Sequence, residues 1–167
     1  HTPMNSLPAE GLELLRAGVD AVTTENLVAL VIGNDKPVFC AGADLGSIAA
    51  AGESGSTEQV AKLIKTGAQT MQALKFAPVP VVAAVRGVAL GGGLELAMSC
   101  HIRYASENAK LGLPEVTLGL IPGYGGTQRL PKLVGKGLAN EIIFSAKMIP
   151  AQRAKEIGLV NEVFSLV

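Results

Sequence analysis

Two carboxylates in this chain stand where acid–base chemistry could be carried out. Glu95 lies three residues after Gly92, in the first turn of an expected helix, where the helix dipole favours an acidic side chain. Glu115 follows Pro114 in a stretch that is otherwise nearly all apolar. A carboxylate in such surroundings is costly unless it is paired, hydrogen-bonded or protonated. If the two groups lie close together in unlike environments, their pKa values can separate to give one acid and one base.

A run of three glycines, Gly91 to Gly93, precedes the expected helix that carries Glu95. The first-turn N–H groups of a helix have no partner within the helix and carry partial positive charge. They could therefore bind a carbonyl oxygen that becomes an enolate oxyanion. Glycine clusters are also common at turns, where they only permit tight packing. The run by itself leaves both interpretations open.

Motifs for several other reaction classes are incomplete. The dinucleotide-binding pattern fails after Gly91 and after Gly123, because the third glycine is missing in each case. Residues 135–137 lack the spacing of a phosphate-binding loop, and no serine stands in a Gly-x-Ser-x-Gly elbow. Cys40 and Cys100 have no metal-binding spacing. We therefore expect no metal site and two buried, reduced thiols.

The composition fits a folded domain and gives no sign of a nucleic-acid or membrane partner. The chain has 167 residues, of which 49% are hydrophobic and 17% charged, which suits one domain with a sizeable core. Fourteen basic and 14 acidic residues cancel, so no surface for nucleic acid is indicated. The longest apolar stretch, Val79 to Val85, is too short for a membrane span, and we see no secretory signal. We expect a cytoplasmic location, or the mitochondrial matrix if the protein is eukaryotic.

Alternating strands and helices must position these residues. Helical spacing is present in residues 8–22, 59–74, 94–99, 127–133, 137–145 and 151–157. Strands are expected at 27–32 and 81–85, both buried on both faces, and at 102–105, 110–113 and 160–164. We expect glycine-rich turns at 38–45 and 123–126, and a mobile loop at 49–57. The alternation predicts an α/β fold.

Four segments resemble those of the enoyl-CoA hydratase (crotonase) family. They are Phe39-Cys40-Ala41-Gly42-Ala43-Asp44-Leu45, residues 89–97, Leu113-Pro114-Glu115-Val116 and residues 121–130. Their order and spacing match the family along nearly the whole chain, and several linked motifs in register are more specific than one glycine pattern. The resemblance implies an α/β fold of the crotonase type, a spiral of ββα units rather than a Rossmann sheet.

The resemblance also implies roles for individual residues. It places the catalytic carboxylates at Glu95 and Glu115, and the N–H groups that hold a thioester oxygen at Ala43 and Gly92. Gly123 matches a position whose N–H helps to hold the reacting water. The implied substrate-binding positions are Ala41, Asp44, Leu45, Leu90, Gly91, Pro114, Leu118 and Gly123. Of these, residues 41–45 are expected to lie along the adenine and pantetheine parts of coenzyme A.

In this family, members that lack one or both glutamates carry out other reactions, such as isomerisation, dehalogenation or ring closure. Retention of both favours a hydratase, which adds water reversibly and syn to a 2-enoyl-CoA to give a 3-hydroxyacyl-CoA in fatty-acid or branched-acid oxidation. Coenzyme A is then part of the substrate, and no separate cofactor is expected. We expect Glu115 to donate the proton to carbon, because its apolar setting favours the neutral acid.

Two features of the family are not expected within this chain. Family members have a strand pair before the region of Asn5 to Leu7, and a C-terminal helical region that closes the acyl pocket and builds the trimer. We therefore expect residues 1–167 to form a single core domain that is truncated at both ends relative to the family. It would be a fragment or one piece of a larger multifunctional protein. Trimers and dimers of trimers are usual in the family, so we expect a homotrimer or hexamer.

Two alternative functions remain open at this stage. An enoyl-CoA isomerase, or another acyl-CoA reaction of the crotonase type, would keep the fold, and the isomerase would need only a proton shuttle. A non-catalytic acyl-CoA-binding or assembly module is an alternative of another class, since a fold does not fix a function.

Overall fold

The computed structural model describes residues 4–53 and 55–166. Its elements, in chain order, are α1 (Ala9–Thr24), β1 (Leu30–Ile32), β2 (Val38–Cys40), α2 (Leu45–Glu53), α3 (Thr57–Lys75), β3 (Val81–Val85), β4 (Val88–Leu90), α4 (Gly92–Ser99), β5 (Ile102–Ser106), β6 (Lys110–Gly112), the 3₁₀ helix η1 (Glu115–Leu118), α5 (Gly126–Val134), α6 (Lys136–Ser145), β7 (Ile149–Pro150), α7 (Ala151–Glu156) and β8 (Glu162–Phe164).

The strands form two sheets between which the chain alternates. One sheet has the order β1-β3-β5-β8 and the other has the order β2-β4-β6-β7. All neighbouring strands are parallel except β6 and β7. Each of the first three strand pairs places one strand in each sheet and is followed by helical structure. This arrangement is a spiral of ββα units, which confirms the predicted fold class.

Helix α4 lies at the centre of the molecule. All eight of its residues are buried, and it packs between strand β2 and helices α3 and α5. A Cβ atom added at Gly93 would lie 2.1 Å from the carbonyl oxygen of Cys40, so only glycine allows this close approach of α4 to β2. The first turn of α4, which carries Glu95, is therefore fixed by the core.

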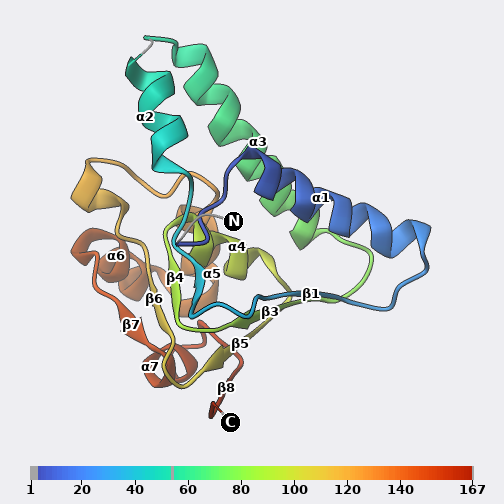
Figure 1. Cartoon of the computed structure of the whole chain (residues 1–167). Coiled ribbons are helices and arrows are strands. Elements are labelled where there is room, and N and C mark those ends of the chain that lie inside the picture. The colour runs from blue at the N-terminus through green and yellow to red at the C-terminus, as the bar shows by residue number, and fades with distance from the viewer. Residues whose placement is uncertain (1–3, 54, 167) are drawn as a thin grey trace.

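Helices α2 and α3 project away from the sheets, and α1 runs beside α3 (Figure 1). Helix α3 begins at a capped end, since the Ser56 side chain accepts a hydrogen bond from the Gln59 N–H at 3.2 Å. Its buried residues Met71 and Leu74 pack into the core. Among the described residues, no helix combines the length and apolar character needed to cross a membrane.

Several sequence predictions about the elements were wrong. The expected turn at 38–45 contains strand β2, and the expected loop at 49–57 lies mostly within helices α2 and α3, with Ser54 outside the described residues. The strand expected at 27–32 is shorter and lies at a sheet edge, so that Val31 is 65% exposed instead of buried. Strands β4 and β7 were not predicted, because each has only two or three residues.

Cys40 and Cys100 are buried and free, as predicted. Burial raises the pKa of the Cys40 thiol to about 11 and that of Cys100 to about 12. A thiol that stays protonated is a poor nucleophile, so both side chains serve as packing groups.

Candidate active site

One cavity of about 240 Å³ brings together nearly all the predicted site residues. It lies where the loops after β2, β4 and β6 meet helices α2 and α3 and the segment before α5. Its lining includes Ala41, Ala43, Leu45, Leu90, Gly91, Gly92, Glu95, Pro114, Glu115, Leu118 and Gly123. Of the predicted residues only Asp44 does not line it; the Asp44 carboxylate instead accepts a hydrogen bond from the Ser47 hydroxyl at 2.5 Å, at the start of α2.

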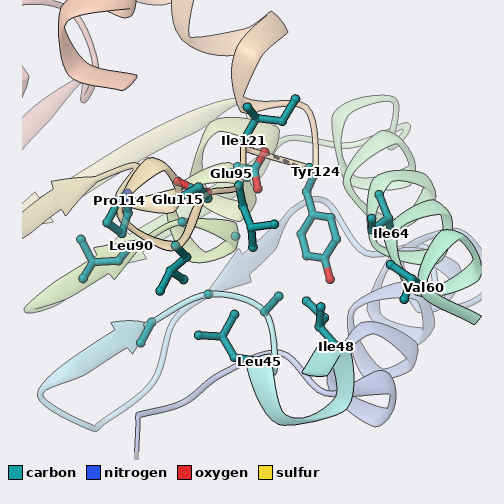
Figure 2. A pocket seen from close by; sticks show the side chains of 18 residues that line it. Leu45, Ile48, Val60, Ile64, Leu90, Glu95, Pro114, Glu115, Ile121 and Tyr124 are labelled. Atoms are coloured by element: carbon teal, nitrogen blue, oxygen red, sulfur yellow. Dashed lines mark hydrogen bonds between the residues drawn. The ribbon is translucent and has the colours of Figure 1, made fainter. Parts of the chain in front are cut away.

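Glu95 is a buried carboxyl held by the backbone of the neighbouring turn. It is 2% exposed, and its Oε1 atom accepts a hydrogen bond from the Tyr124 N–H at 2.8 Å (Figure 2) and another from the Gly126 N–H at 2.6 Å. Burial raises the pKa of Glu95 to about 7, and the charge of Glu115 adds to this rise, while the two N–H groups oppose it. Glu95 therefore titrates at a higher pH than an exposed glutamate.

Glu115 enters the same cavity from the first residue of η1. A Cβ atom added at Gly91 would lie 3.2 Å from Oε1 of Glu115, which places this carboxyl over the turn before α4. Its Oε2 atom is buried without a hydrogen-bond partner among the described residues, and burial raises its pKa. Two carboxyls with raised pKa values thus face one space, an arrangement found at sites of acid–base catalysis.

The sequence favoured Glu115 as the carboxyl with the more apolar setting, but the structure buries Glu95 more deeply. Glu115 is half-buried, whereas Glu95 belongs to the wholly internal helix α4. Local sequence around Glu95 could not show this, because the burial of α4 comes from helices and strands distant in the chain.

The backbone N–H groups of Ala43 and Gly92 approach each other across the cavity. A Cβ atom added at Gly92 would lie 3.1 Å from the Ala43 nitrogen, and one added at Gly42 would lie 3.3 Å from the Gly92 nitrogen. Gly42 has φ +107°, a conformation that strongly favours glycine. Glycines at 42 and 92 therefore keep this space open.

Both of these N–H groups are available to a ligand. Leu7 bonds to the residues on either side of Ala43, accepting from the Asp44 N–H and donating to the Gly42 carbonyl, so the Ala43 N–H faces away from it. Gly92 is the first residue of α4, whose backbone bonding begins with the Glu95 N–H to the Gly91 carbonyl at 2.9 Å. Neither N–H donates to a carbonyl within the described part of the chain. The pair can bind one oxygen atom.

The sequence did not single out several residues of this site. Ile48 of α2 and Val60 and Ile64 of α3 form an apolar wall, and Tyr124 stands beside it (Figure 2). Ile48 was missed because most of α2 was expected to be a loop, and Val60 and Ile64 were missed because helical spacing does not show which face of a helix meets a cavity. Tyr124 could have been noticed as the single large side chain in the glycine-rich turn at 123–126.

Arg129 supports the turn that holds Glu95. Its Nη1 atom donates to the Tyr124 carbonyl at 2.6 Å, and its side chain is 7% exposed. Its positive charge opposes the rise in the pKa of Glu95. In the described ranges, no three His, Cys, Asp or Glu side chains gather closely enough to hold a metal ion.

A family model described as enoyl-CoA hydratase/isomerase matches residues 1–167. This chain belongs to that family. The crotonyl-CoA hydratase of Syntrophomonas wolfei is 43% identical over 162 residues, covering 96% of this chain and 61% of that protein. The mitochondrial methylglutaconyl-CoA hydratase of Rattus norvegicus is 44% identical over 161 residues, covering 95% of this chain and 50% of that protein.

Solved structures of the enoyl-CoA hydratase/isomerase family share this fold. The enoyl-CoA hydratase from Bacillus anthracis superposes with a TM-score of 0.90 at 43% identity, covering 97% of this chain and 62% of that chain. This structural similarity to a protein with 43% sequence identity confirms the crotonase-type fold. The chain spans half to about six-tenths of the length of the curated relatives that it matches.

Proposed function

We propose that this chain carries the active site of an enoyl-CoA hydratase, which adds water reversibly and syn to a 2-enoyl-CoA to give a 3-hydroxyacyl-CoA. One observation carries the proposal: Glu95 and Glu115 line the same cavity as the available N–H groups of Ala43 and Gly92. Relatives named crotonyl-CoA hydratase and methylglutaconyl-CoA hydratase support this choice of reaction within the family.

The thioester oxygen would lie between the N–H groups of Ala43 and Gly92. As negative charge develops on that oxygen, each fixed donor stabilises the transition state, by on the order of 3 kcal/mol in comparable sites. These hydrogen bonds withdraw electrons from the conjugated double bond toward the thioester oxygen, which makes the β-carbon of the enoyl group electrophilic. The apolar lining of the cavity strengthens these hydrogen bonds because it excludes most of the water that would compete for them.

The two glutamates would then divide the proton transfers. A water held by Glu95, Glu115 and the Gly123 N–H gives a proton to one ionised carboxylate while its oxygen bonds to the β-carbon, and the other, protonated glutamate donates to the α-carbon. Glu95 suits the carboxylate role because two N–H groups stabilise its charge. Glu115 suits the donor role because its Oε2 atom has no hydrogen-bond partner among the described residues. No separate cofactor is needed for these steps.

The test is hydration of crotonyl-CoA, followed by the loss of absorbance of the conjugated thioester. Glu95→Gln and Glu115→Gln should each lower kcat by about 100-fold or more, the usual contribution of a positioned acid or base. Glu141→Gln, on the exposed face of α6, is the matched control and should keep wild-type turnover. Near-normal turnover by either active-site variant would remove that residue from the scheme.

The same assay separates the alternative functions. An isomerase would convert a 3-enoyl-CoA without hydrating the 2-enoyl-CoA. A binding or assembly module would take up acyl-CoA in calorimetry without turnover of either substrate.

We also propose that the protein acts in fatty-acid or branched-acid oxidation, in the bacterial cytoplasm or the mitochondrial matrix, as a homotrimer or hexamer. A mitochondrial relative supports the second location. Exposed apolar side chains support association, since such surface is usually covered in an assembly; they include Leu118 and Ile121 at the cavity and Phe144 on α6. Sedimentation equilibrium would show a monomer if the assembly proposal is wrong.

A further inference from the structure

The Tyr124 side chain is locked in place inside the cavity. A Cβ atom added at Gly67 of α3 would lie 2.2 Å from Cε1 of its ring, and one added at Gly92 of α4 would lie 3.2 Å from Cδ2 and Cε2 on the other edge. The ring therefore spans the gap between the two helices, and only glycine at position 67 leaves room for it. Tyr124 is 7% exposed.

The backbone of Tyr124 is fixed as firmly as its ring. Its N–H donates to Oε1 of Glu95 at 2.8 Å, and its carbonyl accepts from Nη1 of Arg129 at 2.6 Å. These hydrogen bonds fix the backbone from which the ring projects, and the close packing of the ring between Gly67 and Gly92 limits its rotation. It is thus a rigid wall rather than a movable gate.

The ring stands between the reacting centre and an apolar end of the cavity. Figure 2 shows Glu95 and Glu115 on one side of the ring, Val60 and Ile64 on the opposite side, and Ile48 beyond its hydroxyl end. The Tyr124 hydroxyl points toward the apolar side chain of Ile48 in the same view. A hydrocarbon tail is the chemical group that this end of the cavity would accommodate, and the phenol occupies part of that space.

We propose that Tyr124 is a specificity-determining residue that closes the apolar end of the cavity, so that the site accepts short enoyl chains and excludes long ones. The inference rests on the proposed function, because it assumes that the substrate carbonyl lies on the N–H groups of Ala43 and Gly92. With the carbonyl there, the Tyr124 ring touches the residue that donates one of those bonds, so a growing acyl chain meets it directly.

The test compares kcat/KM for crotonyl-CoA with that for trans-2-octenoyl-CoA. The wild-type protein should prefer crotonyl-CoA. Tyr124→Ala should lower that preference by about 10-fold or more, the usual scale of discrimination by pocket size. Tyr124→Phe keeps the ring and is the matched control, so its preference should stay within about 2-fold of wild type. An unchanged preference in Tyr124→Ala would overturn the inference.

Removal of a buried ring can unfold a protein, so Tyr124→Leu is the second variant. Leucine still packs against Gly67 but leaves the far end of the cavity open, and it should shift the preference in the same direction as alanine. Thermal unfolding of each variant shows that the comparison is made on folded protein. If Tyr124→Leu is folded and retains the wild-type preference, the inference is wrong.

Binding of butyryl-CoA and octanoyl-CoA, measured by calorimetry, separates this inference from the proposed reaction. These saturated thioesters cannot be hydrated. Discrimination between them that is lost in Tyr124→Leu would support the role of Tyr124 even if no hydration occurs. Hydration with equal binding of both chain lengths by wild type and variant would support the reaction and overturn the inference.

Discussion

The Oε1 atom of Glu95 lies 2.6 Å from the backbone nitrogen of Gly126, the first residue of α5. The free N–H groups at a helix N-terminus carry partial positive charge, so α5 is oriented to stabilise the ionised form of Glu95. Burial acts in the opposite direction and raises its pKa to about 7. The balance keeps this carboxyl ready to exchange a proton near neutral pH.

Gly126→Ala should lower kcat for crotonyl-CoA by about 10-fold, because misplacement of a catalytic group by a fraction of an ångström is costly. The added Cβ would lie 3.0 Å from Oε1 of Glu95 and 3.0 Å from Cβ of Pro122, so the carboxyl must shift. Gly137→Ala, at the second residue of α6, meets no atom within 4 Å and serves as the control. Equal kcat values in the two variants would show that the Gly126 contact does not position Glu95.

Gly92→Ala should lower kcat/KM by about 100-fold or more, as expected for loss of a donor to the thioester oxygen. The added Cβ would lie 3.1 Å from the Ala43 nitrogen and would occupy the place of the bound oxygen. The measurement is steady-state hydration, with the fold checked by circular dichroism. The Gly137→Ala variant again provides the control. Wild-type kcat/KM in folded Gly92→Ala protein would mean that the oxygen binds elsewhere.

The sequence predicted most of the site because its chemistry depends on residue types at fixed spacing. The glycine turns before α4 and α5 and the glutamates at 95 and 115 were recognised in this way, and the structure places them around one cavity. Asp44 was expected from the resemblance to lie along coenzyme A, and that role stays a prediction; its carboxylate accepts a hydrogen bond from the Ser47 hydroxyl at the start of α2.

Features that depend on contacts between distant segments could not be predicted. Tyr124 is held by Gly67, and neither residue signals the other in the sequence. Helix α2 contains glycine and serine beside its three alanines and has few apolar residues to show a helical spacing, and it packs as a helix against α3. Exposure of Val31 follows from the place of β1 at the sheet edge, which an apolar run alone does not reveal.

Glu95 should make the stability of the protein fall as pH rises. Its pKa is about 7 in the folded state and 4.5 in the unfolded state, so the folded state binds more protons between these two pH values. The contribution of Glu95 to the free energy of unfolding is therefore greatest below pH 4.5 and is lost as the pH rises to about 7. The full effect is about 3 kcal/mol.

Comparison with Glu95→Gln isolates this effect, because glutamine does not titrate. Urea unfolding of both proteins across this pH range should show the wild type losing free energy of unfolding relative to the variant as pH rises. Contributions from groups that do not interact with Glu95 cancel in the difference. A difference that is constant with pH, or that changes in the opposite direction, would show that the pKa of Glu95 is not raised.

In a plot of kcat/KM against pH, Arg129→Met should shift the acidic limb, where activity rises with pH, to higher pH. The Arg129 charge holds the pKa of Glu95 down, so its removal raises that pKa further and delays ionisation of the proposed base. Arg129→Lys restores a positive charge and should return the limb part of the way toward wild type, although a lysine cannot reproduce the planar guanidinium.

Lys132→Met is the control for Arg129→Met, because Lys132 is an exposed cation on the same helix that contributes nothing to the pKa of Glu95. Its pH profile should match that of the wild type. A general loss of structural support at the turn would lower kcat at all pH values without moving the limb. Loss of the Arg129 charge, by contrast, would shift the acidic limb to higher pH. A lower kcat with an unshifted limb would mean that Arg129 supports the turn only by its hydrogen bond to the Tyr124 carbonyl.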